Sequence, residues 1–387
     1  FFFAKMFAVR CVRPATSGMK LAAMIRMHSA GCCKTYSIPK TMKAAIVEEF
    51  NKPLVVKQVP VPEPGYGQVL IKIIASGVCH TDLHVRDGDW IVKPQLPIIP
   101  GHEGAGVVVK LGEGVTTLKV GDRVGSAWLH DSCGHCTYCR SGWETVCSHQ
   151  SQTGFASNGC FAEYTVAEAE YVGKIPDELS FSQAAPVLCA GVTTYKALKE
   201  TEVKPGQWVA VIGACGGLGH VGVQYAKAMG MKVCAVDFGP ERGEYALNRL
   251  GCRAYVDIKG RTSEQIVAEV KKACDGEGTH GTVVLAPVNA AFRQGLDMLR
   301  PLGTCVAIAL PPGDFPVDIF TMVLHRKTMR GSIVGTRQDL HEALEIAGDG
   351  SVTCTIEERK LDDINKVFDD LHAGKIKGRV VLRLADE

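Results

Sequence analysis

Long apolar runs and a strong net charge are both missing from this sequence. No stretch approaches the roughly 18–20 consecutive apolar residues that a membrane-spanning helix needs. The formal net charge is +2 over 387 residues, and no basic stripe interleaved with aromatic residues occurs in the body of the chain. We therefore expect a soluble protein without a nucleic-acid or membrane partner. Hydrophobic residues make up 46% of the chain, which excludes disorder, and its length favours two domains.

Acidic residues are absent before Glu48, whereas Lys and Arg recur through the first forty residues with Ser, Thr and Ala between them. This composition is typical of a mitochondrial or plastid transit peptide. Two other interpretations are sequence upstream of a start at Met42 and a disordered tail, and the sequence does not begin with Met. We expect residues 1–41 to be such a leader, with a mitochondrial matrix location if it is a transit peptide and a cytoplasmic one otherwise.

A small disulfide-bonded scaffold is not expected, although the chain has 16 cysteines. Such scaffolds are short and rich in loops, whereas this chain is long and bunches four cysteines at metal-ligand spacing. Metal thiolates in a reducing compartment explain that bunching better. The cysteines outside the metal candidates are expected to be buried small side chains or free thiols: Cys11, Cys32, Cys33, Cys160, Cys215, Cys234, Cys252, Cys274, Cys305 and Cys354.

Four cysteines lie on one short segment. Two residues separate Cys133 from Cys136 and Cys136 from Cys139, and seven residues separate Cys139 from Cys147. Four thiolates can close a tetrahedron around zinc and leave no position for water or substrate, which is the pattern of a structural site. An iron–sulfur cluster is the chemical alternative, and cysteines spaced by chance are the simplest one. Ligand softness and spacing favour a structural zinc.

The pattern of elements changes near Leu179. Before it, short apolar runs broken by Gly and Pro predict a β-rich domain, and after it apolar strands alternate with helices. Continuous apolar strands of this kind are typical of a buried parallel sheet, so the second region predicts a doubly wound α/β fold. The predicted strands are 42–47, 69–74, 208–213, 232–237, 282–286, 304–309 and 379–384, and the predicted helices include 181–185, 193–198 and 218–229. The last strand has no sheet of its own, so we expect it to return to the first domain.

A glycine-rich loop joins the predicted strand 208–213 to the helix that follows it. Its glycines allow the backbone to approach a pyrophosphate, which then lies at the helix N-terminus. The spacing has one residue more than G-x-G-x-x-G, and a loop of this kind is a weak signal alone. Asp237 ends the next strand, where a carboxylate accepts hydrogen bonds from ribose hydroxyls and repels a 2′-phosphate, so NAD is favoured over NADP. The expected cofactor residues of this region are Gly213, Gly216, Gly217, Leu218, Gly219, Asp237 and Arg242.

A second metal site is harder to see, because its ligands would lie far apart in the sequence. Candidates are Cys79 and His80, then His102 with Glu103, and then Cys189. A catalytic zinc has three protein ligands and one open position. Each candidate taken alone is more often a buried cysteine or a core histidine, so the residues by themselves leave this site open.

The sequence resembles the zinc-containing medium-chain dehydrogenases, specifically the alcohol dehydrogenases of yeast and bacterial type. The segment Gly101-His-Glu-x2-Gly106-x5-Gly112-x2-Val115 fits that family's zinc signature at every defined position. The Gly77–His84 segment, the four-cysteine segment and the turn Leu188–Gly191 also match. The resemblance extends from about Met42 to Arg379.

The resemblance implies roles for individual residues. Those matching Cys79, His102 and Cys189 bind a catalytic zinc, and those matching Cys133, Cys136, Cys139 and Cys147 bind a structural one. Glu103 matches a carboxylate behind the catalytic metal that can reach it in some states, and Asp82 matches an acidic residue that orients the zinc-bound histidine. His80 and Arg379 match residues that contact the pyrophosphate. The implied fold is a β-rich, GroES-like catalytic domain, 42–189 with 331–387, plus an NAD-binding Rossmann domain, 190–330.

The implied reaction is the interconversion of short primary alcohols, such as ethanol, and aldehydes. Zinc as a Lewis acid lowers the pKa of the alcohol so that an alkoxide forms, and the alkoxide gives a hydride to NAD. Thr81 and His84 match a proton relay that runs from a hydroxyl through the cofactor ribose to a surface histidine. Trp90 and Trp128 match bulky residues of the substrate pocket, although both could be ordinary packing residues. Relatives of this type are often homotetramers.

Two other functions compete with a zinc-dependent, NAD-linked alcohol dehydrogenase. A zinc-free quinone or enone reductase of the same superfamily is disfavoured by the four-cysteine segment and by the Gly101-His-Glu motif. A zinc-binding scaffold without activity is disfavoured by the complete set of proposed ligand and relay residues. Metal analysis, with two zinc ions per chain expected, and NADH formation on ethanol would separate the three.

Overall fold

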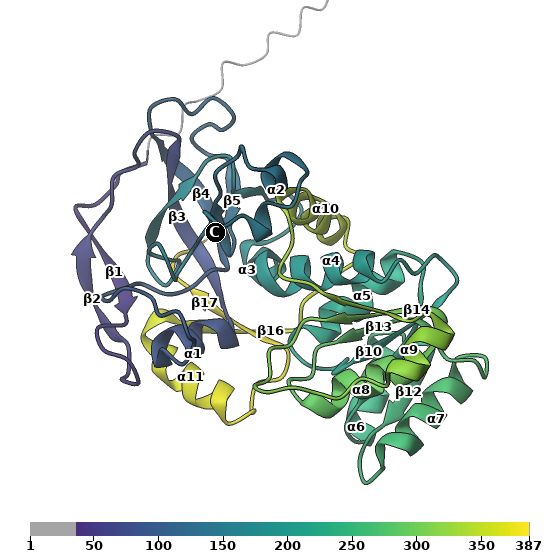
Figure 1. Cartoon of the computed structure of the whole chain (residues 1–387). Helices are drawn as coiled ribbons and strands as arrows, with labels where there is room; N and C mark the ends of the chain where they lie inside the picture. Colours follow the sequence, from purple (N-terminus) through teal and green to yellow (C-terminus); the bar gives the residue numbers. More distant parts are fainter. Residues whose placement is uncertain (1–35, 387) are drawn as a thin grey trace, which may run out of the picture. The chain divides into compact units, whose positions relative to one another are not determined.

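Two large sheets organise residues 36–386, the part of the chain that this computed structural model describes (Figure 1). The first sheet contains β10 (Trp208–Ile212), β11 (Lys232–Asp237), β12 (Ala254–Asp257), β13 (Thr279–Val284), β14 (Leu299–Ala307) and β15 (Thr328–Gly331). Its order is β12-β11-β10-β13-β14-β15, and every neighbouring pair is parallel. The chain order therefore reverses at β10, which is the switch point where dinucleotides bind in this topology.

Helices cover both faces of the parallel sheet. One core joins α4 (Val192–Glu200) and α5 (Gly219–Ala228) to it, and another joins α7 (Ser263–Ala273) and α8 (Asn289–Asp297). Apolar residues fill the strands themselves, and all five residues of β10 are buried. Burial on both faces requires such continuous apolar strands. The remaining helices of this region are α6 (Pro240–Glu244), η3 (Tyr245–Arg249) and α9 (Ile319–His325).

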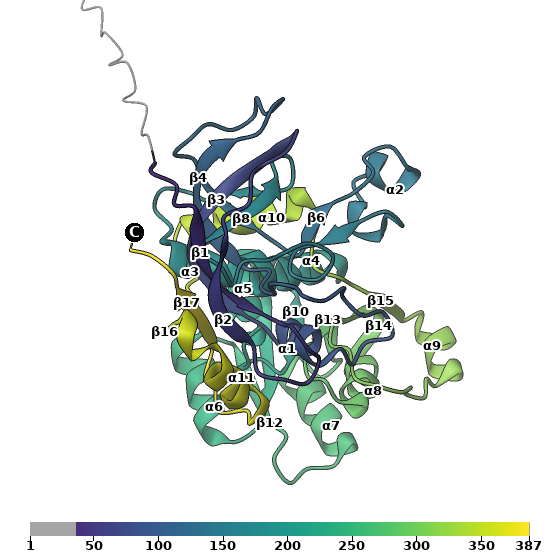
Figure 2. The same cartoon turned by 90° about the vertical axis from the view of Figure 1, so that its left-hand side faces the viewer.

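The second sheet contains β3 (Gln68–Val78), β4 (Gly104–Leu111), β5 (Arg123–Ser126), β8 (Tyr164–Glu168), β9 (Gly173–Lys174), β16 (Ile356–Lys360) and β17 (Arg379–Arg383). Its order is β16-β17-β3-β4-β5-β9, and β8 also pairs with β3. β17, the last strand of the chain, runs antiparallel to β3 and so joins strands from the first half of the chain (Figure 2). The predicted fold class, a β-rich region with a doubly wound parallel sheet, is confirmed.

Smaller elements complete the described residues. Two short sheets pair β1 (Thr41–Ile46) with β2 (Val55–Pro60) and β6 (Leu129–Asp131) with β7 (Ser151–Gln152). The helices outside the parallel sheet are α1 (His80–Asp87), α2 (Thr137–Arg140), η1 (Glu144–Val146), α3 (Phe181–Pro186), η2 (Val187–Gly191), α10 (Arg337–Gly348), η4 (Leu361–Asp363) and α11 (Ile364–His372). No helix within residues 36–386 has both the length and the apolar character needed to cross a membrane. The predicted leader lies outside the described residues, apart from residues 36–41.

Candidate metal and cofactor sites

Three side chains from distant segments meet between the two sheets. Cys79 is the N-cap of α1, His102 precedes β4, and Cys189 lies in η2, a single π-helical turn between α3 and α4. The Sγ atoms of Cys79 and Cys189 are 4.0 Å apart, and His102 Nε2 is 3.3 Å from Cys189 Sγ. All three side chains are buried. A π turn inside a helix often marks a functional site, and here it presents Cys189 to the other two.

Asp82 holds the His102 ring and the Cys79 backbone of this cluster in place. Its Oδ1 lies 2.9 Å from His102 Nδ1 and accepts the Gly101 N–H, and its Oδ2 accepts the Cys79 N–H at 2.9 Å. Because a carboxylate only accepts, the His102 ring donates from Nδ1 and turns the Nε2 lone pair toward the two sulfurs. Burial opposes a charge on His102, but the Asp82 carboxylate outweighs it and raises the pKa of the ring well above its ordinary value.

The donor set fits zinc. Two thiolates bound to one zinc at about 2.3 Å lie about 3.8 Å apart at the corners of a tetrahedron, close to the 4.0 Å observed. The contact with the Cys189 thiol holds the pKa of Cys79 well below its usual range, which favours the thiolate that a metal needs. A Glu103 carboxylate oxygen lies within 4.8 Å of the other three donor atoms. With Cys79, His102 and Cys189 as ligands, the fourth position of a tetrahedral zinc would go to a substrate oxygen or to Glu103.

The four-cysteine segment forms a second cluster. The Sγ–Sγ distances are 3.9 Å for Cys133–Cys139, 3.5 Å for Cys136–Cys139 and 3.6 Å for Cys133–Cys147, again near the edge of a zinc tetrahedron. Backbone N–H groups point at the sulfurs, as from Cys136 to Cys133 at 3.4 Å. Such donors, first that of His135 and then that of Cys136, lower the pKa of Cys133 to about 6. Four soft donors and no open position fit a structural zinc.

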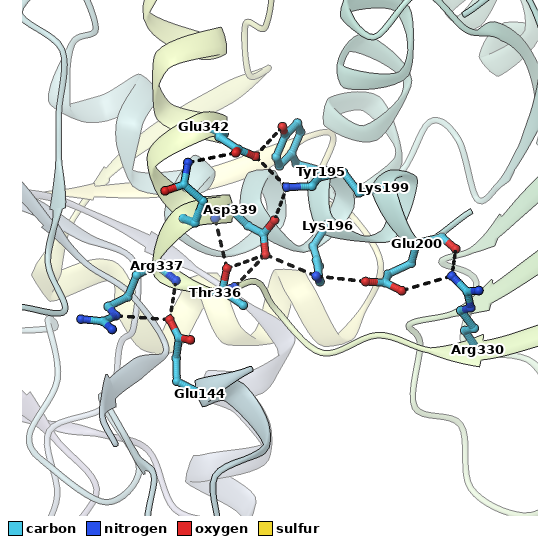
Figure 3. A network of polar contacts seen from close by, with 11 residues as sticks. Glu144, Tyr195, Lys196, Lys199, Glu200, Arg330, Thr336, Arg337, Asp339 and Glu342 are labelled. Carbon is cyan, nitrogen blue, oxygen red and sulfur yellow. Dashed lines mark hydrogen bonds and ion pairs between the residues drawn. The ribbon is translucent and has the colours of Figure 1, made fainter. Parts of the chain in front are cut away.

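A polar network fastens this segment to the rest of the molecule (Figure 3). Glu144, on η1 between Cys139 and Cys147, accepts the Arg337 N–H at 2.9 Å where α10 begins. In the same first turn of α10, buried Asp339 accepts a hydrogen bond from Lys199 at 2.8 Å and caps the helix together with Thr336. The network continues along α4, so the segment, α10 and α4 form one connected unit.

The glycine-rich loop lies between β10 and α5, at the switch point of the parallel sheet. The close approach at Gly219 allows no side chain, because a Cβ there would lie 2.0 Å from the Gly213 carbonyl oxygen. Leu218 is the N-cap residue of α5, so the first N–H groups of the helix face the loop. This cradle fits a pyrophosphate.

Asp237, at the end of β11, already accepts three hydrogen bonds. Its Oδ2 accepts the Cys215 N–H at 2.7 Å, and its Oδ1 accepts from the Phe238 N–H and, at 2.5 Å, from Arg242 Nη1. The carboxylate is thus held in place with its charge partly neutralised. The structure brings the Arg242 guanidinium to Asp237, and the Arg242 carbonyl accepts a hydrogen bond from the Cys215 thiol of the glycine loop at 3.3 Å, so the position beside the loop fits a ribose.

Comparisons with known proteins agree with this geometry. The alcohol dehydrogenase GroES-like domain matches residues 65–177, and the zinc-binding dehydrogenase domain matches residues 217–348. An alcohol dehydrogenase of Rhizobium meliloti is 54% identical over 89% of this chain and 99% of its own, and one of Geobacillus stearothermophilus is 54% identical over 89% and 100%. The solved alcohol dehydrogenase of Aeropyrum pernix is 33% identical over 88% and 99%, with a TM-score of 0.79.

The chain belongs to the zinc-containing medium-chain alcohol dehydrogenases. It is an oxidoreductase, and zinc and NAD are the cofactors of this activity. The two donor clusters and the glycine loop of this dehydrogenase supply the sites that those cofactors require.

Arg379 lies between the two cofactor sites of the dehydrogenase. Its guanidinium pairs with Glu103, and both side chains are buried. Burial raises the pKa of Glu103 to about 7, against the opposing effect of Arg379. A Cβ on Gly217 would be 3.3 Å from Arg379 Cδ, so the arginine also lies against the glycine loop. Arg379 is therefore beside the loop, as a pyrophosphate contact requires, but its charge is shared with Glu103.

Gly77 makes room for the Glu103 carboxylate, because a Cβ at Gly77 would lie 1.9 Å from Glu103 Oε2. The same oxygen is buried without a hydrogen-bond partner among the described residues. An unpartnered carboxylate oxygen beside three metal donors is consistent with a cation nearby. Burial lowers the pKa of His80, the first residue of α1, and the nearby positive charge of Arg379 lowers it further.

The aromatic residues of the dehydrogenase form a wall beside the donor cluster. Trp90 and Trp128 meet edge to face with ring centroids 6.2 Å apart, and Trp128 is 5.2 Å from the His102 ring. Phe155 completes the wall at 5.8 Å from Trp90 and 6.0 Å from Trp128. Phe155 was not predicted, and its only signal in the sequence is that it is a bulky apolar residue in an otherwise small and polar loop.

Thr81 and His84 lie three residues apart on α1 and so share one face of the helix. His84 Nδ1 contacts Asp89 Oδ2 at 2.9 Å, and its ring centroid is 5.4 Å from that of Trp90.

The remaining cysteines of the described residues are free: Cys215 is half-buried, and Cys160, Cys234, Cys252, Cys274, Cys305 and Cys354 are buried. Cys11, Cys32 and Cys33 lie outside the described residues.

Proposed function

We propose that this dehydrogenase interconverts short primary alcohols, such as ethanol, and their aldehydes with NAD, at the cluster formed by Cys79, His102 and Cys189. The observation that carries the proposal is the convergence of these three donor atoms, with the Glu103 carboxylate within 4.8 Å of them, beside a wall of three aromatic rings. The wall lies against the His102 ring, so it limits the room for a substrate near the donor atoms.

Two cofactors supply the chemistry. Cys79, His102 and Cys189 would hold a zinc ion, which would supply a Lewis acid for an alcohol or aldehyde oxygen. The glycine loop, Asp237 and Arg379 would hold NAD, which would supply the hydride acceptor and donor. The chain keeps the donors in position through Asp82, which fixes the tautomer of His102 and the backbone of Cys79 at once.

The chain also moves the alcohol proton. We assign to Thr81 Oγ1 the acceptance of the proton from the substrate hydroxyl while its own hydroxyl proton passes to the cofactor ribose. To His84, three residues further along α1, we assign the uptake of a proton from the ribose and its release to solvent. Replacing His84 with Gln should slow alcohol oxidation at neutral pH and leave a rate that added imidazole partly restores. An unchanged pH profile of the rate would remove His84 from the proton path.

A substrate panel tests the function directly. Full-length protein that carries two zinc ions per chain should form NADH from ethanol, with much lower activity on long or aromatic alcohols and with NADP. Replacing Trp90 with Ala should shift kcat/KM toward longer alcohols by about tenfold for each added methylene that the widened pocket accepts. A wild-type preference for aromatic alcohols would contradict the narrow pocket.

We further propose that the protein is a homo-oligomer, and specifically a homotetramer. α9 presents Ile319, Phe320, Val323 and Leu324 to solvent with 61% to 75% of each side chain exposed. Beside it, β15 pairs with a single neighbour and ends the parallel sheet. A second copy of the chain would cover this apolar face. Light scattering should give four chains, and Phe320→Asp should lower that number.

The composition of residues 1–41 supports a proposal of import into the mitochondrial matrix. A fluorescent protein fused to these residues should enter mitochondria, whereas a fusion that begins at Met42 should stay in the cytoplasm. Cytoplasmic fluorescence from both fusions would contradict the proposal.

A further inference from the structure

His220 ties the glycine loop to the segment that carries Arg379. It lies in the first turn of α5 and is fully buried. Its Nδ1 is 3.0 Å from the Gly216 carbonyl oxygen, and its Nε2 is 3.1 Å from the Thr355 backbone nitrogen. A carbonyl only accepts and a backbone N–H only donates, so the partners require a neutral ring with its proton on Nδ1.

The residues Thr353–Thr355, here called the connector, lead into β16 and are held almost entirely by side chains. Both backbone groups of Thr353 bond to Gln224, at 3.0 Å each. Both backbone groups of Cys354 bond to Gln183, at 3.1 and 2.8 Å. The Thr355 N–H donates to His220 Nε2, and the Thr355 carbonyl accepts the Arg379 N–H at 2.8 Å. Side chains thus replace a sheet neighbour along this segment.

These contacts form a short path between the two walls of the cofactor site. One wall is the glycine loop at Gly216, and the other is Arg379 at the start of β17. The path runs from the Gly216 carbonyl to the His220 ring, from the ring to the Thr355 N–H, and from the Thr355 carbonyl to the Arg379 N–H. The loop belongs to the parallel sheet and Arg379 to the other sheet, so the His220 ring links the two.

We infer that His220 is a positioning residue for NAD, which sets the spacing of the glycine loop and Arg379, and that cofactor affinity falls when its ring is protonated. The inference rests on the proposed NAD site. An imidazolium carries an N–H on both nitrogens, so Nε2–H would face the Thr355 N–H, donor against donor. The connector and Arg379 would then move away from the loop.

The surroundings favour the neutral ring. Burial lowers the pKa of His220, the Gly216 carbonyl opposes this, and the Arg379 charge from β17 lowers it further. Gln224 on α5 and Tyr245 on η3, which contacts the Thr355 hydroxyl, are polar but not ionic neighbours. Because the folded-state pKa lies below the ordinary value, the tie is intact at neutral pH and is lost only as acid protonates the ring. NAD affinity should therefore be flat near neutral pH and fall by at most about tenfold per pH unit below the pKa of His220.

NADH binding to the full-length, zinc-loaded chain tests the inference, followed by cofactor fluorescence from pH 5 to 8. His220→Phe keeps the ring shape and removes both contacts, and it should raise the Kd for NADH about tenfold at neutral pH. His220→Gln can accept the Thr355 N–H without titrating, so its Kd should stay within about threefold of wild type and lose the rise at acidic pH. In turnover, KM for NAD should rise in His220→Phe without an equal loss of kcat.

Tyr225→Phe is the matched control. It removes another buried hydrogen bond of α5, from the Tyr225 hydroxyl to the Ala343 carbonyl at 2.8 Å, on a part of the helix away from the loop. It should leave the Kd and its pH dependence unchanged. Equal Kd values in wild type and His220→Phe, or the same acid-induced weakening in His220→Gln, would overturn the inference alone. A wild-type chain that binds no NADH would overturn the proposed function and the inference with it.

Discussion

The two donor clusters of this dehydrogenase hold similar atoms in opposite settings. Cys133, Cys136, Cys139 and Cys147 come from one continuous segment, and three of these four side chains are only half-buried. The cluster of Cys79, His102 and Cys189 is assembled from three segments and is buried throughout. A continuous segment can bind its metal before the rest of the molecule folds, whereas the assembled cluster depends on the completed fold. This difference is what our proposal of a structural first cluster and a catalytic second cluster would require.

The largest expected effect follows from a change at the assembled cluster. Replacing Cys189 with Ser should remove one of two zinc ions per chain and lower kcat by about a thousandfold or more, because several kcal/mol of transition-state stabilisation is lost. Thermal unfolding should change little. Cys160→Ser is the matched control, since Cys160 is fully buried nearby but is not a donor of either cluster. Equal losses of activity in both variants would place the effect in packing rather than in metal binding.

The second effect concerns the support of that cluster. Asp82→Asn keeps the shape of the side chain but weakens its hold on the His102 ring and the Cys79 backbone, so metal affinity or activity should fall by roughly 10- to 100-fold. Metal content after dialysis and kcat/KM on ethanol measure this loss. Wild-type values for both would show that the two cysteines and the histidine need no orientation.

The third effect should separate the clusters. Cys136→Ser should cost the four-cysteine segment its zinc and lower the unfolding temperature by about 2–3 °C, the shift that a loss of roughly 2 kcal/mol produces in a chain of 387 residues. Folded protein should retain kcat within a few-fold of wild type. Calorimetry and active-site titration measure the two quantities. A loss of kcat as deep as that of Cys189→Ser would break the distinction between a structural and a catalytic cluster.

The smallest effect concerns the contact that joins the four-cysteine segment to α10. Glu144→Gln weakens the interaction of the buried carboxylate with the Arg337 N–H and guanidinium, at a cost of about 1 kcal/mol. Amide hydrogen exchange of residues 133–147 should become faster, while zinc content and kcat remain unchanged. Unaltered exchange would mean that the metal alone holds the segment in place.

Local spacing let the sequence predict which residues lie close together. The intervals from Cys133 to Cys147 and the glycines from Gly213 to Gly219 are short enough that chain geometry brings them together. The site of Cys189 could be assigned only through a family resemblance, because the π turn that presents its thiol depends on packing between α3 and α4. The resemblance likewise supplied Arg379, and the structure adds that its charge is shared with Glu103.

Other features left no readable pattern in the sequence. Phe155 joins the aromatic wall only because its loop returns to Trp90 and Trp128. His220 and the connector are 135 residues apart, and their contact depends on how two sheets meet. Tertiary contacts of this kind follow from packing of distant segments, which the periodicity of a single segment does not encode.

The place of β17 in its sheet has a consequence for how the protein is made. β17 lies between β16 and β3, and its Arg379 pairs with Glu103 across 276 residues of sequence. A ribosome that adds about 5–20 residues per second needs on the order of tens of seconds to reach the second partner after the first. During that interval a carboxylate bound for the interior has no counter-ion, and β3 exposes an edge to the solvent. Throughout synthesis of the intervening residues, the sheet that β3 begins therefore lacks the last strand and the arginine that complete it.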